Sequence, residues 1–86
     1  MTSMYHPAPK SLAGFPGLFP VKWKTPMRGG GGMRRRWKDE RGNIYEWDYR
    51  HGTVEMYDPR GRHLGEFDPV NGQKLKAAQP GRRVEP

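Results

Sequence analysis

The chain of 86 residues contains no cysteine, which excludes a disulfide framework and a thiolate metal site. No apolar run approaches the roughly 20 residues that span a bilayer. Nothing at the N-terminus resembles a signal peptide, so we expect another segment or cell lysis to carry an exported protein. Large hydrophobic residues are also scarce, because Leu, Ile, Val and Phe together number 12. With a net charge of +7, that scarcity is typical of disordered chains.

Aromatic residues offset this shortage. The chain has three Trp, four Tyr and three Phe, and each buried aromatic side chain removes roughly 150–250 Å² from water. We therefore expect a single domain over residues 1–86 with a thin aromatic core. Tyr45 and Trp47 are predicted to belong to that core. Tyr49 and Tyr57 could pack there too, or could stack on RNA bases.

Positive charge is concentrated in the first half of the chain. Residues 1–38 hold eight Lys or Arg and no acid, and all nine acids follow from Asp39 onward. A segment of one charge sign is attracted to anionic partners, most often nucleic acid, although a solvated basic tail has the same composition. Arg34, Arg35 and Arg36 follow a run of four glycines. We expect these arginines to bind phosphates and not bases.

The spacing of turn residues predicts the fold. Residues 1–33 are rich in Pro and Gly and are predicted to form an irregular basic arm, in which a short helix near residues 10–14 or a strand at 21–25 is compatible with the sequence. From 34 to 79, short alternating runs are separated by glycines at 42, 52, 61 and 72. This pattern predicts a twisted antiparallel meander of about five strands, followed by a basic tail at 80–86. The expected class is mainly β, or α+β at most.

One predicted turn gathers the titratable side chains Asp48, His51 and Glu55. Cleavage of RNA by its own 2′-hydroxyl needs a base, an acid and positive charge near the phosphate, and these residue types supply the first two. A turn with an even number of residues places Asp48 and Glu55 on one face, whereas an odd turn or a bulge at Gly52 separates them. The alternative is that the acids only pair with arginines across strands and that the turn histidine is inert.

Metal chemistry is not expected. The three histidines, His6, His51 and His63, are scattered and lack the spacing of a zinc site. We therefore predict no metal and no cofactor.

The chain as a whole resembles the cytotoxic domain of the colicins that cleave small-subunit ribosomal RNA. The resemblance keeps its order along nearly the whole sequence, which makes it more specific than any single motif. It rests on Tyr5-His6-Pro7-Ala8-Pro9-Lys10, the glycine run with Trp37, Ile44-Tyr45-Glu46-Trp47-Asp48, His51-Gly52, His63-Leu64-Gly65, Phe67-Asp68-Pro69, Gly72, Leu75-Lys76 and Pro80.

This resemblance implies a twisted antiparallel sheet with a short N-terminal helix. It implies a metal-independent endoribonuclease that cuts 16S ribosomal RNA once at the decoding site and leaves a 2′,3′-cyclic phosphate. The family's catalytic positions fall on Glu55 as general base, His51 as general acid and Asp48 as the residue that orients His51. Its catalytic arginine falls on Arg82, with Arg83 one residue away as the alternative.

The resemblance also implies partners. Arg34 and Lys76 match positions that contact RNA, and the target is the small ribosomal subunit. An acidic immunity protein would bind the domain, and other domains of a larger toxin would import it. Such a toxin is made and released by a producer bacterium and acts in the cytoplasm of a target bacterium. Two alternatives remain open: a non-catalytic basic RNA-binding module, and a related toxin that cuts transfer RNA.

Overall fold

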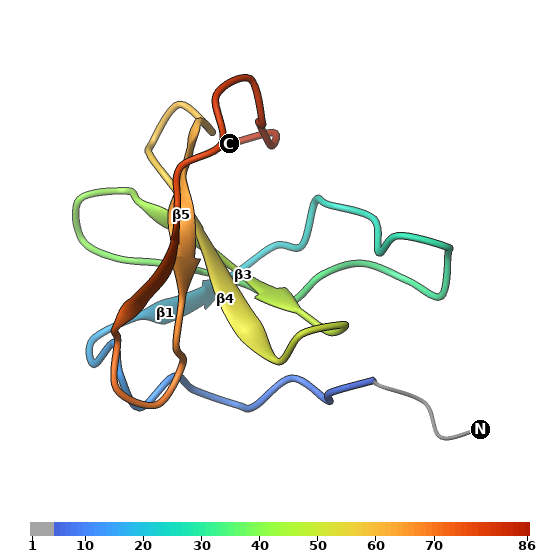
Figure 1. Cartoon of the computed structure of the whole chain (residues 1–86), viewed down its shortest axis with the longest axis horizontal. Helices are drawn as coiled ribbons and strands as arrows, with labels where there is room; N and C mark the ends of the chain where they lie inside the picture. Colours follow the sequence, from blue (N-terminus) through green and yellow to red (C-terminus); the bar gives the residue numbers. More distant parts are fainter. Residues whose placement is uncertain (1–4) are drawn as a thin grey trace.

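In the computed structural model, which describes residues 5–86, the chain forms one sheet of six antiparallel strands (Figure 1). Each strand pairs with the next along the chain, so the sheet is a simple meander. The strands are β1 Phe19–Val21, β2 Arg36–Lys38, β3 Ile44–Asp48, β4 Thr53–Tyr57, β5 His63–Phe67 and β6 Lys74–Ala77. The prediction of a mainly β fold is confirmed. Of the predicted arm, residues 1–4 lie outside the described residues.

The sheet has one strand more than expected, and it comes from the predicted arm. β1 lies at 19–21 and not at 21–25, and it pairs with β2 through Phe19 opposite Lys38 and Val21 opposite Arg36. Pro20 lies in its middle, which an edge strand tolerates because one side of that strand needs no ladder hydrogen bond.

The predicted helix near residues 10–14 is wrong, since the described residues contain no helix at all. The backbone groups that a helix would use are bonded elsewhere. The Lys10 carbonyl accepts a hydrogen bond from the Trp37 indole at 3.4 Å, and the Gly14 amide donates to the Pro69 carbonyl at 2.8 Å. Leu12, 3% exposed, packs into the core. Residues 5–86 accordingly include no helix with the length and hydropathy needed to cross a membrane.

Each of the four tight turns between β2 and β6 is built in the same way. An Asp at its start accepts backbone amides two to four residues further on, and a Gly with positive φ ends it. Carboxylates that bond their own downstream amides favour such turns, and glycine adopts the left-handed conformation without strain. The pairs are Asp39 with Gly42, Asp48 with Gly52, Asp58 with Gly61, and Asp68 with Gly72.

One face of the sheet carries the aromatic core. Trp37, Tyr45, Trp47 and Val54 are buried there together with Leu12 of the N-terminal arm. In Figure 1 this arm, drawn in blue, runs alongside the sheet. The placement of Tyr45 and Trp47 in the core is confirmed. Because large aromatic side chains fill this face, a few aliphatic residues suffice to complete it.

The opposite face is also buried, but it is polar. Two segments contact this face: the C-terminal residues, and the loop from 22 to 34, whose far end extends away from the strands in Figure 1. The two segments meet where Lys24 donates to the Pro86 carbonyl at 2.7 Å. Tyr57 is 1% exposed on this face, so it packs there and is not a platform for RNA bases. The buried charged or polar side chains here are Arg36, Glu46, Asp48, Glu55, His63 and Glu66.

Candidate active site

A row of charged residues crosses five strands of the polar face. The strand register places Arg36, Glu46, Glu55, Glu66 and Lys76 opposite one another in succession. Three carboxylates on neighbouring strands repel one another unless cations or protons intervene. The partners of each carboxylate show which part of the row is structural and which part is open to chemistry.

The β2 end of the row is a closed ion pair. Two guanidinium nitrogens of Arg36 lie 2.7 and 2.9 Å from Glu46 Oε2, and the two side chains are 1% and 0% exposed. The Thr25 hydroxyl donates to the same oxygen at 2.6 Å. Arg36 was expected to bind RNA phosphates, but its charge is committed to the interior of the protein. We therefore leave it out of the RNA surface.

Asp48 and His51 form a second pair at the turn between β3 and β4. The loop has four residues, and Asp48 stands opposite Thr53 as Glu46 stands opposite Glu55. The even spacing therefore places Asp48 and Glu55 on one face. Asp48 uses Oδ1 to accept the amides of Arg50 and His51, and Oδ2 lies 2.7 Å from His51 Nδ1.

These contacts determine which atoms of Asp48 and His51 carry protons. Burial raises the pKa of Asp48, but the hydrogen bonds from the His51 ring and the two turn amides outweigh it and hold that pKa below its usual value. An ionised carboxylate can only accept, so His51 Nδ1 carries a proton and donates it. The Nε2 atom on the other side of this half-exposed ring is left for chemistry.

Glu55 lies deeper, on β4, and is held by two residues from later in the chain. Its Oε1 is 2.7 Å from His63 Nε2 and 3.5 Å from an Arg82 nitrogen. His63 Nδ1 accepts the Gln79 amide at 3.0 Å, so this nitrogen carries no proton and Nε2 is the donor to Glu55. Burial raises the pKa of Glu55 more than His63 and Arg82 lower it, and the charge of Glu66 adds to the rise.

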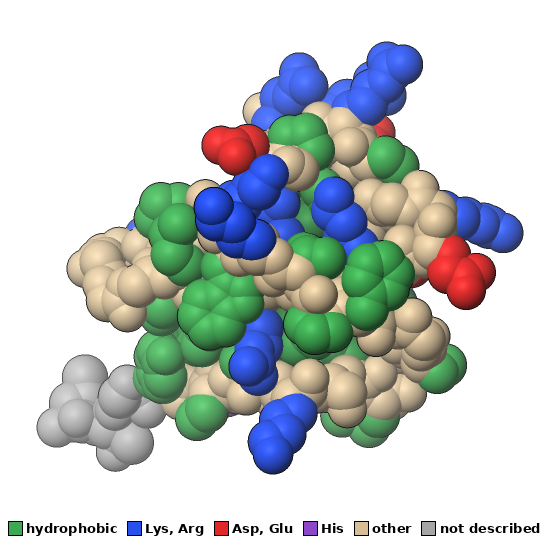
Figure 2. All heavy atoms as spheres, turned by 180° about the vertical axis from the view of Figure 1, so that it is seen from behind, with side chains coloured by type: hydrophobic (Ala, Val, Ile, Leu, Met, Phe, Trp, Pro, Cys, Tyr) green, Lys and Arg blue, Asp and Glu red, His purple; other side chains and the backbone are tan. Residues whose placement is uncertain are grey.

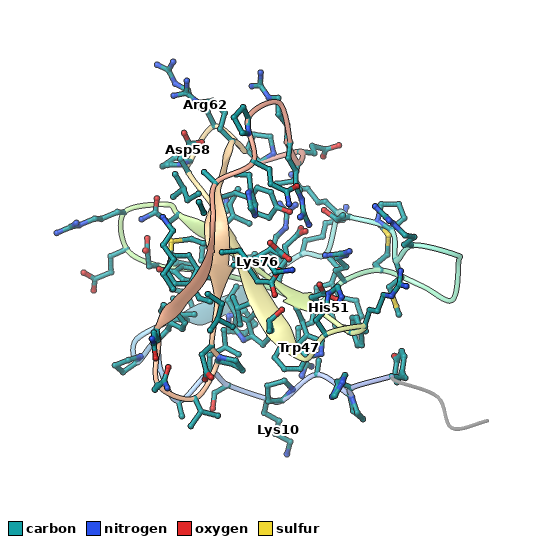
Figure 3. The ribbon with its side chains drawn as sticks, in the orientation of Figure 1. Lys10, Trp47, His51, Asp58, Arg62 and Lys76 are labelled. Carbon is teal, nitrogen blue, oxygen red and sulfur yellow. The ribbon has the colours of Figure 1, made fainter. Side chains whose placement is uncertain are left out.

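An open cleft of about 480 Å³ joins these groups. It contains six of the residues singled out from the sequence, namely Asp48, His51, Glu55, Arg34, Lys76 and Arg82. His51 and Lys76, labelled in Figure 3, both line this cleft, whereas the Asp58–Arg62 pair, near the top of that view, lies outside it. Arg34 contributes a buried Nη1 atom that has no hydrogen-bond partner among the described residues.

The remaining predicted RNA contacts lie elsewhere. Arg35 donates to the Pro9 carbonyl at 3.1 Å, and its guanidinium lies 5.6 Å from the centre of the Trp23 ring. Arg83 is exposed, and its backbone pairs with that of Arg62 in an isolated antiparallel β-bridge. Of the two arginines left open by the sequence, Arg82 is therefore the one whose side chain approaches Glu55.

Sequence reasoning missed His63 and Glu66 because of a bulge in β5. These residues are three positions apart, and strict alternation places them on opposite faces. In the structure Tyr57 pairs with His63 and Met56 with Gly65, so the residue between them has no partner. This shift brings both side chains to the face of Glu55. The glycine at 65 is the sequence signal that could have suggested a bulge.

One group of side chains could hold a metal ion. Ligand atoms of Asp48, His51 and Glu66 all lie within 4.8 Å of one another. A cation there would have to displace the hydrogen bond between Asp48 and His51, which already satisfies two of these ligands. The expectation of metal-independent chemistry stays a prediction.

Views of the opposite side show a different surface. Figure 2 shows Lys and Arg side chains spread among apolar ones, with acidic side chains near the margin. Three acids, Asp48, Glu55 and Glu66, line the cleft of this basic protein. Exposed cations around a concentrated acidic site are suited to draw in a polyanion and to act on it at one point.

Comparisons with known proteins identify the family of the chain. The sequence profile of the family described as Cytotoxic matches residues 6–85. Three proteins of Escherichia coli are similar over 94% of this chain: Colicin E3 at 47% identity, Colicin-E6 at 46% and Cloacin at 45%. The chain spans about 15% of the length of these curated relatives.

Proposed function

Because the chain belongs to the Cytotoxic family that it shares with these colicins and cloacin, we propose that it is the endoribonuclease domain of a bacteriocin-type toxin. The observation that carries this proposal is the cleft in which Glu55 and His51 lie together with Arg82. A carboxylate and an imidazole beside a cation are the groups that RNA cleavage by its own 2′-hydroxyl requires.

Glu55 is the general base of this reaction. It removes the proton of the 2′-hydroxyl while that oxygen attacks the adjacent phosphorus. The bond from phosphorus to the 5′-oxygen then breaks, and His51 Nε2 protonates the leaving oxygen. The products are a 2′,3′-cyclic phosphate and a 5′-hydroxyl. A buried carboxylate whose pKa is raised is a stronger base than an exposed one.

Asp48 and Arg82 support the two proton transfers. Asp48 fixes the ring of His51 through Nδ1 at 2.7 Å, which directs Nε2 away from the turn. Arg82 lies next to Glu55, where it can stabilise the charge that builds up on the phosphate oxygens. Arg34 and Lys76, on the walls of the cleft, bind the flanking phosphates. The partnerless Nη1 of Arg34 fits a phosphate oxygen as acceptor.

The proposed substrate is 16S ribosomal RNA at the decoding site of the small subunit, where one cut halts translation. A basic domain with a net charge of +7 also fits an acidic immunity protein as its inhibitor in the producer cell. Further domains of a larger toxin would deliver it to the cytoplasm of the target bacterium. The cluster of Asp48, Glu55 and Glu66 argues against a module that merely binds RNA, because each acid repels phosphate.

Incubation of the purified chain with intact ribosomes and, separately, with bulk transfer RNA tests this proposal. We expect one cut in 16S RNA, a 2′,3′-cyclic phosphate on the upstream fragment and intact transfer RNA. Because ribosomes need Mg²⁺ for their own structure, metal independence is tested with a decoding-site RNA fragment in EDTA. Glu55→Gln is expected to slow cleavage by about 10²–10⁴-fold, the usual contribution of a general base.

Glu40→Gln is the matched control, since it makes the same change of charge at an exposed position outside the cleft. It should cleave like the wild type. The mechanism is wrong if fragment cleavage stops in EDTA or if Glu55→Gln retains full activity. Cleavage of transfer RNA in place of 16S RNA would move the proposal to the other class of toxin.

A further inference from the structure

One carboxylate of the charged row has no cationic partner among the described residues. Glu46 is paired with Arg36, and Glu55 is approached by Arg82. Glu66 is 8% exposed, yet within residues 5–86 no Lys, Arg or His nitrogen forms an ion pair with it. Its hydrogen bond comes from the Thr53 hydroxyl at 3.0 Å. A buried carboxylate without a cation costs free energy, and in a cleft for RNA it also repels the ligand.

Glu66 lies near both proposed proton-transfer groups, Glu55 and His51. It lies directly opposite Glu55 in the register of β4 and β5. Its carboxylate also lies within 4.8 Å of ligand atoms of both Asp48 and His51. The Thr53 hydroxyl, which comes from the same strand as Glu55, keeps it in this position. Lys76 is its partner in the register of β5 and β6, but no ion pair joins them in the described structure.

We propose that Glu66 is a positioning residue of the ribonuclease reaction, whose negative charge keeps Glu55 able to accept the proton of the 2′-hydroxyl. This inference rests on the proposed function. Arg82 and the hydrogen bond from His63 both stabilise the Glu55 carboxylate, and a carboxylate that is stabilised too well is a weak base. The charge of Glu66 opposes them from the neighbouring strand.

Every charged group around Glu55 enters this balance. Burial makes the largest contribution to the raised pKa of Glu55, His63 and Arg82 lower that pKa, and Glu66 raises it. The groups that face Glu55 are Glu46 from β3, His63 and Glu66 from β5, and Arg82 from the C-terminal segment, with Arg34, Asp48, His51 and Lys76 around the cleft.

The test is Glu66→Gln, measured by single-turnover cleavage of a decoding-site RNA fragment across pH. Without the negative charge, Glu55 loses a proton more readily, so the acidic limb of the rate profile moves to lower pH. The plateau rate falls about tenfold because the base is weaker. RNA carrying a 2′-deoxy sugar at the cut site, which cannot react, binds more tightly because a repulsive charge is gone. A folding defect would instead weaken both rate and binding.

Two further variants keep the inference open to refutation. Glu66→Asp retains the charge and should keep the acidic limb near its wild-type position. Glu40→Gln should change neither rate nor limb. If Glu66→Gln does not fold, Glu66→Ser replaces it with the same expected outcomes. The inference is overturned if the acidic limb of Glu66→Gln stays at its wild-type pH. It is also overturned if Glu66→Asp shifts that limb as far as Glu66→Gln does. Either result refutes the role of Glu66 but leaves the proposed function standing, as long as the wild type cleaves RNA and Glu55→Gln does not. If the wild type itself fails to cleave RNA, the proposed function is refuted.

Discussion

Two hairpin turns of the sheet, at residues 48–52 and 68–72, have the same hydrogen bonds. In each, the Asp carbonyl accepts the Gly amide, at 2.8 Å in the first turn and 2.9 Å in the second. In each, Asp Oδ1 accepts the amides two and three residues on, at 2.9 and 3.1 Å from Asp48 and at 2.8 and 3.2 Å from Asp68. The glycines have φ values of 68° and 75°.

The difference lies in the third residue after the Asp and in what surrounds it. His51 reaches Oδ2 of Asp48 and lines the cleft beside Glu55. Asn71 occupies the same place in the other turn, and its side chain accepts the Gln73 amide at 2.8 Å within the turn. The Asp and the Gly therefore make the turn, while the histidine and the neighbouring strands make the site. One oxygen of Asp48 holds the turn, and the other contacts the His51 ring.

Truncating the side chain of the third residue after the Asp should give the largest difference in activity between the two turns. His51→Ala takes away the proposed general acid, and we expect ribosome cleavage to fall by about 10²–10⁴-fold. Asn71→Ala makes a comparable truncation outside the cleft and should cleave within a few-fold of the wild type. The measurement is the single-turnover rate at pH 7, with the urea midpoint of each variant as the check on folding. Equal losses in the two variants would mean that His51 acts only through the turn.

The carboxylates provide a second, smaller contrast. Asn keeps an oxygen that can hold the turn, so Asp48→Asn and Asp68→Asn should each change the free energy of unfolding by no more than about 1.5 kcal/mol. In Asp48→Asn the new side-chain amide would face His51 Nδ1 as a donor and reverse the ring's hydrogen bonding, as in other carboxylate–histidine pairs. We expect about a 10²-fold loss of cleavage from Asp48→Asn and no loss from Asp68→Asn. A matched loss in both variants would assign the effect to the turn and not to the His51 ring.

The pH dependence of stability checks the same contact. The pKa of Asp48 is held below its usual value, so its ionised form stabilises the native protein above that usual value. This stabilisation disappears as the pH falls through the lowered pKa. The difference in urea midpoint between wild type and Asp48→Asn should therefore shrink toward strongly acidic pH. A difference that stays constant would show that the His51–Asp48 hydrogen bond does not favour the carboxylate.

These turns also show why much of the fold was predictable. Glycines at intervals of nine to eleven residues with short alternating runs between them define hairpins locally. The sequence grouped Asp48, His51 and Glu55 around one turn but left open whether Asp48 and Glu55 share a face, which the four-residue loop at 49–52 decides. By contrast, β1 depends on a distant partner, Lys38, and strand propensity does not favour Pro20 at its centre.

The placement of other residues could not be predicted from the local sequence pattern, because contacts between distant segments determine it. The bulge in β5 decides that His63 and Glu66 face Glu55, and neither residue belongs to the local motif. Arg36 belongs to a basic run that resembles an RNA contact, yet its position opposite Glu46 makes it an interior ion pair. Arg82 reaches Glu55 across 27 residues of sequence, because the C-terminal segment pairs with Arg62 and returns over the sheet.

The glycines give the smallest contrast, and it should appear in stability alone. Gly52→Ala and Gly72→Ala each force an L-residue into positive φ, which costs about 1–2 kcal/mol of stability. At Gly72 a Cβ would also lie 2.8 Å from the Gly14 carbonyl oxygen, whose residue is tied to Pro69 by a backbone hydrogen bond. At Gly52 the nearest atoms, at 3.0 Å, belong to the His6 side chain, which can rotate away. We therefore expect a lower urea midpoint for Gly72→Ala than for Gly52→Ala; the reverse order would mean that His6 is as firmly fixed as the backbone at Gly14.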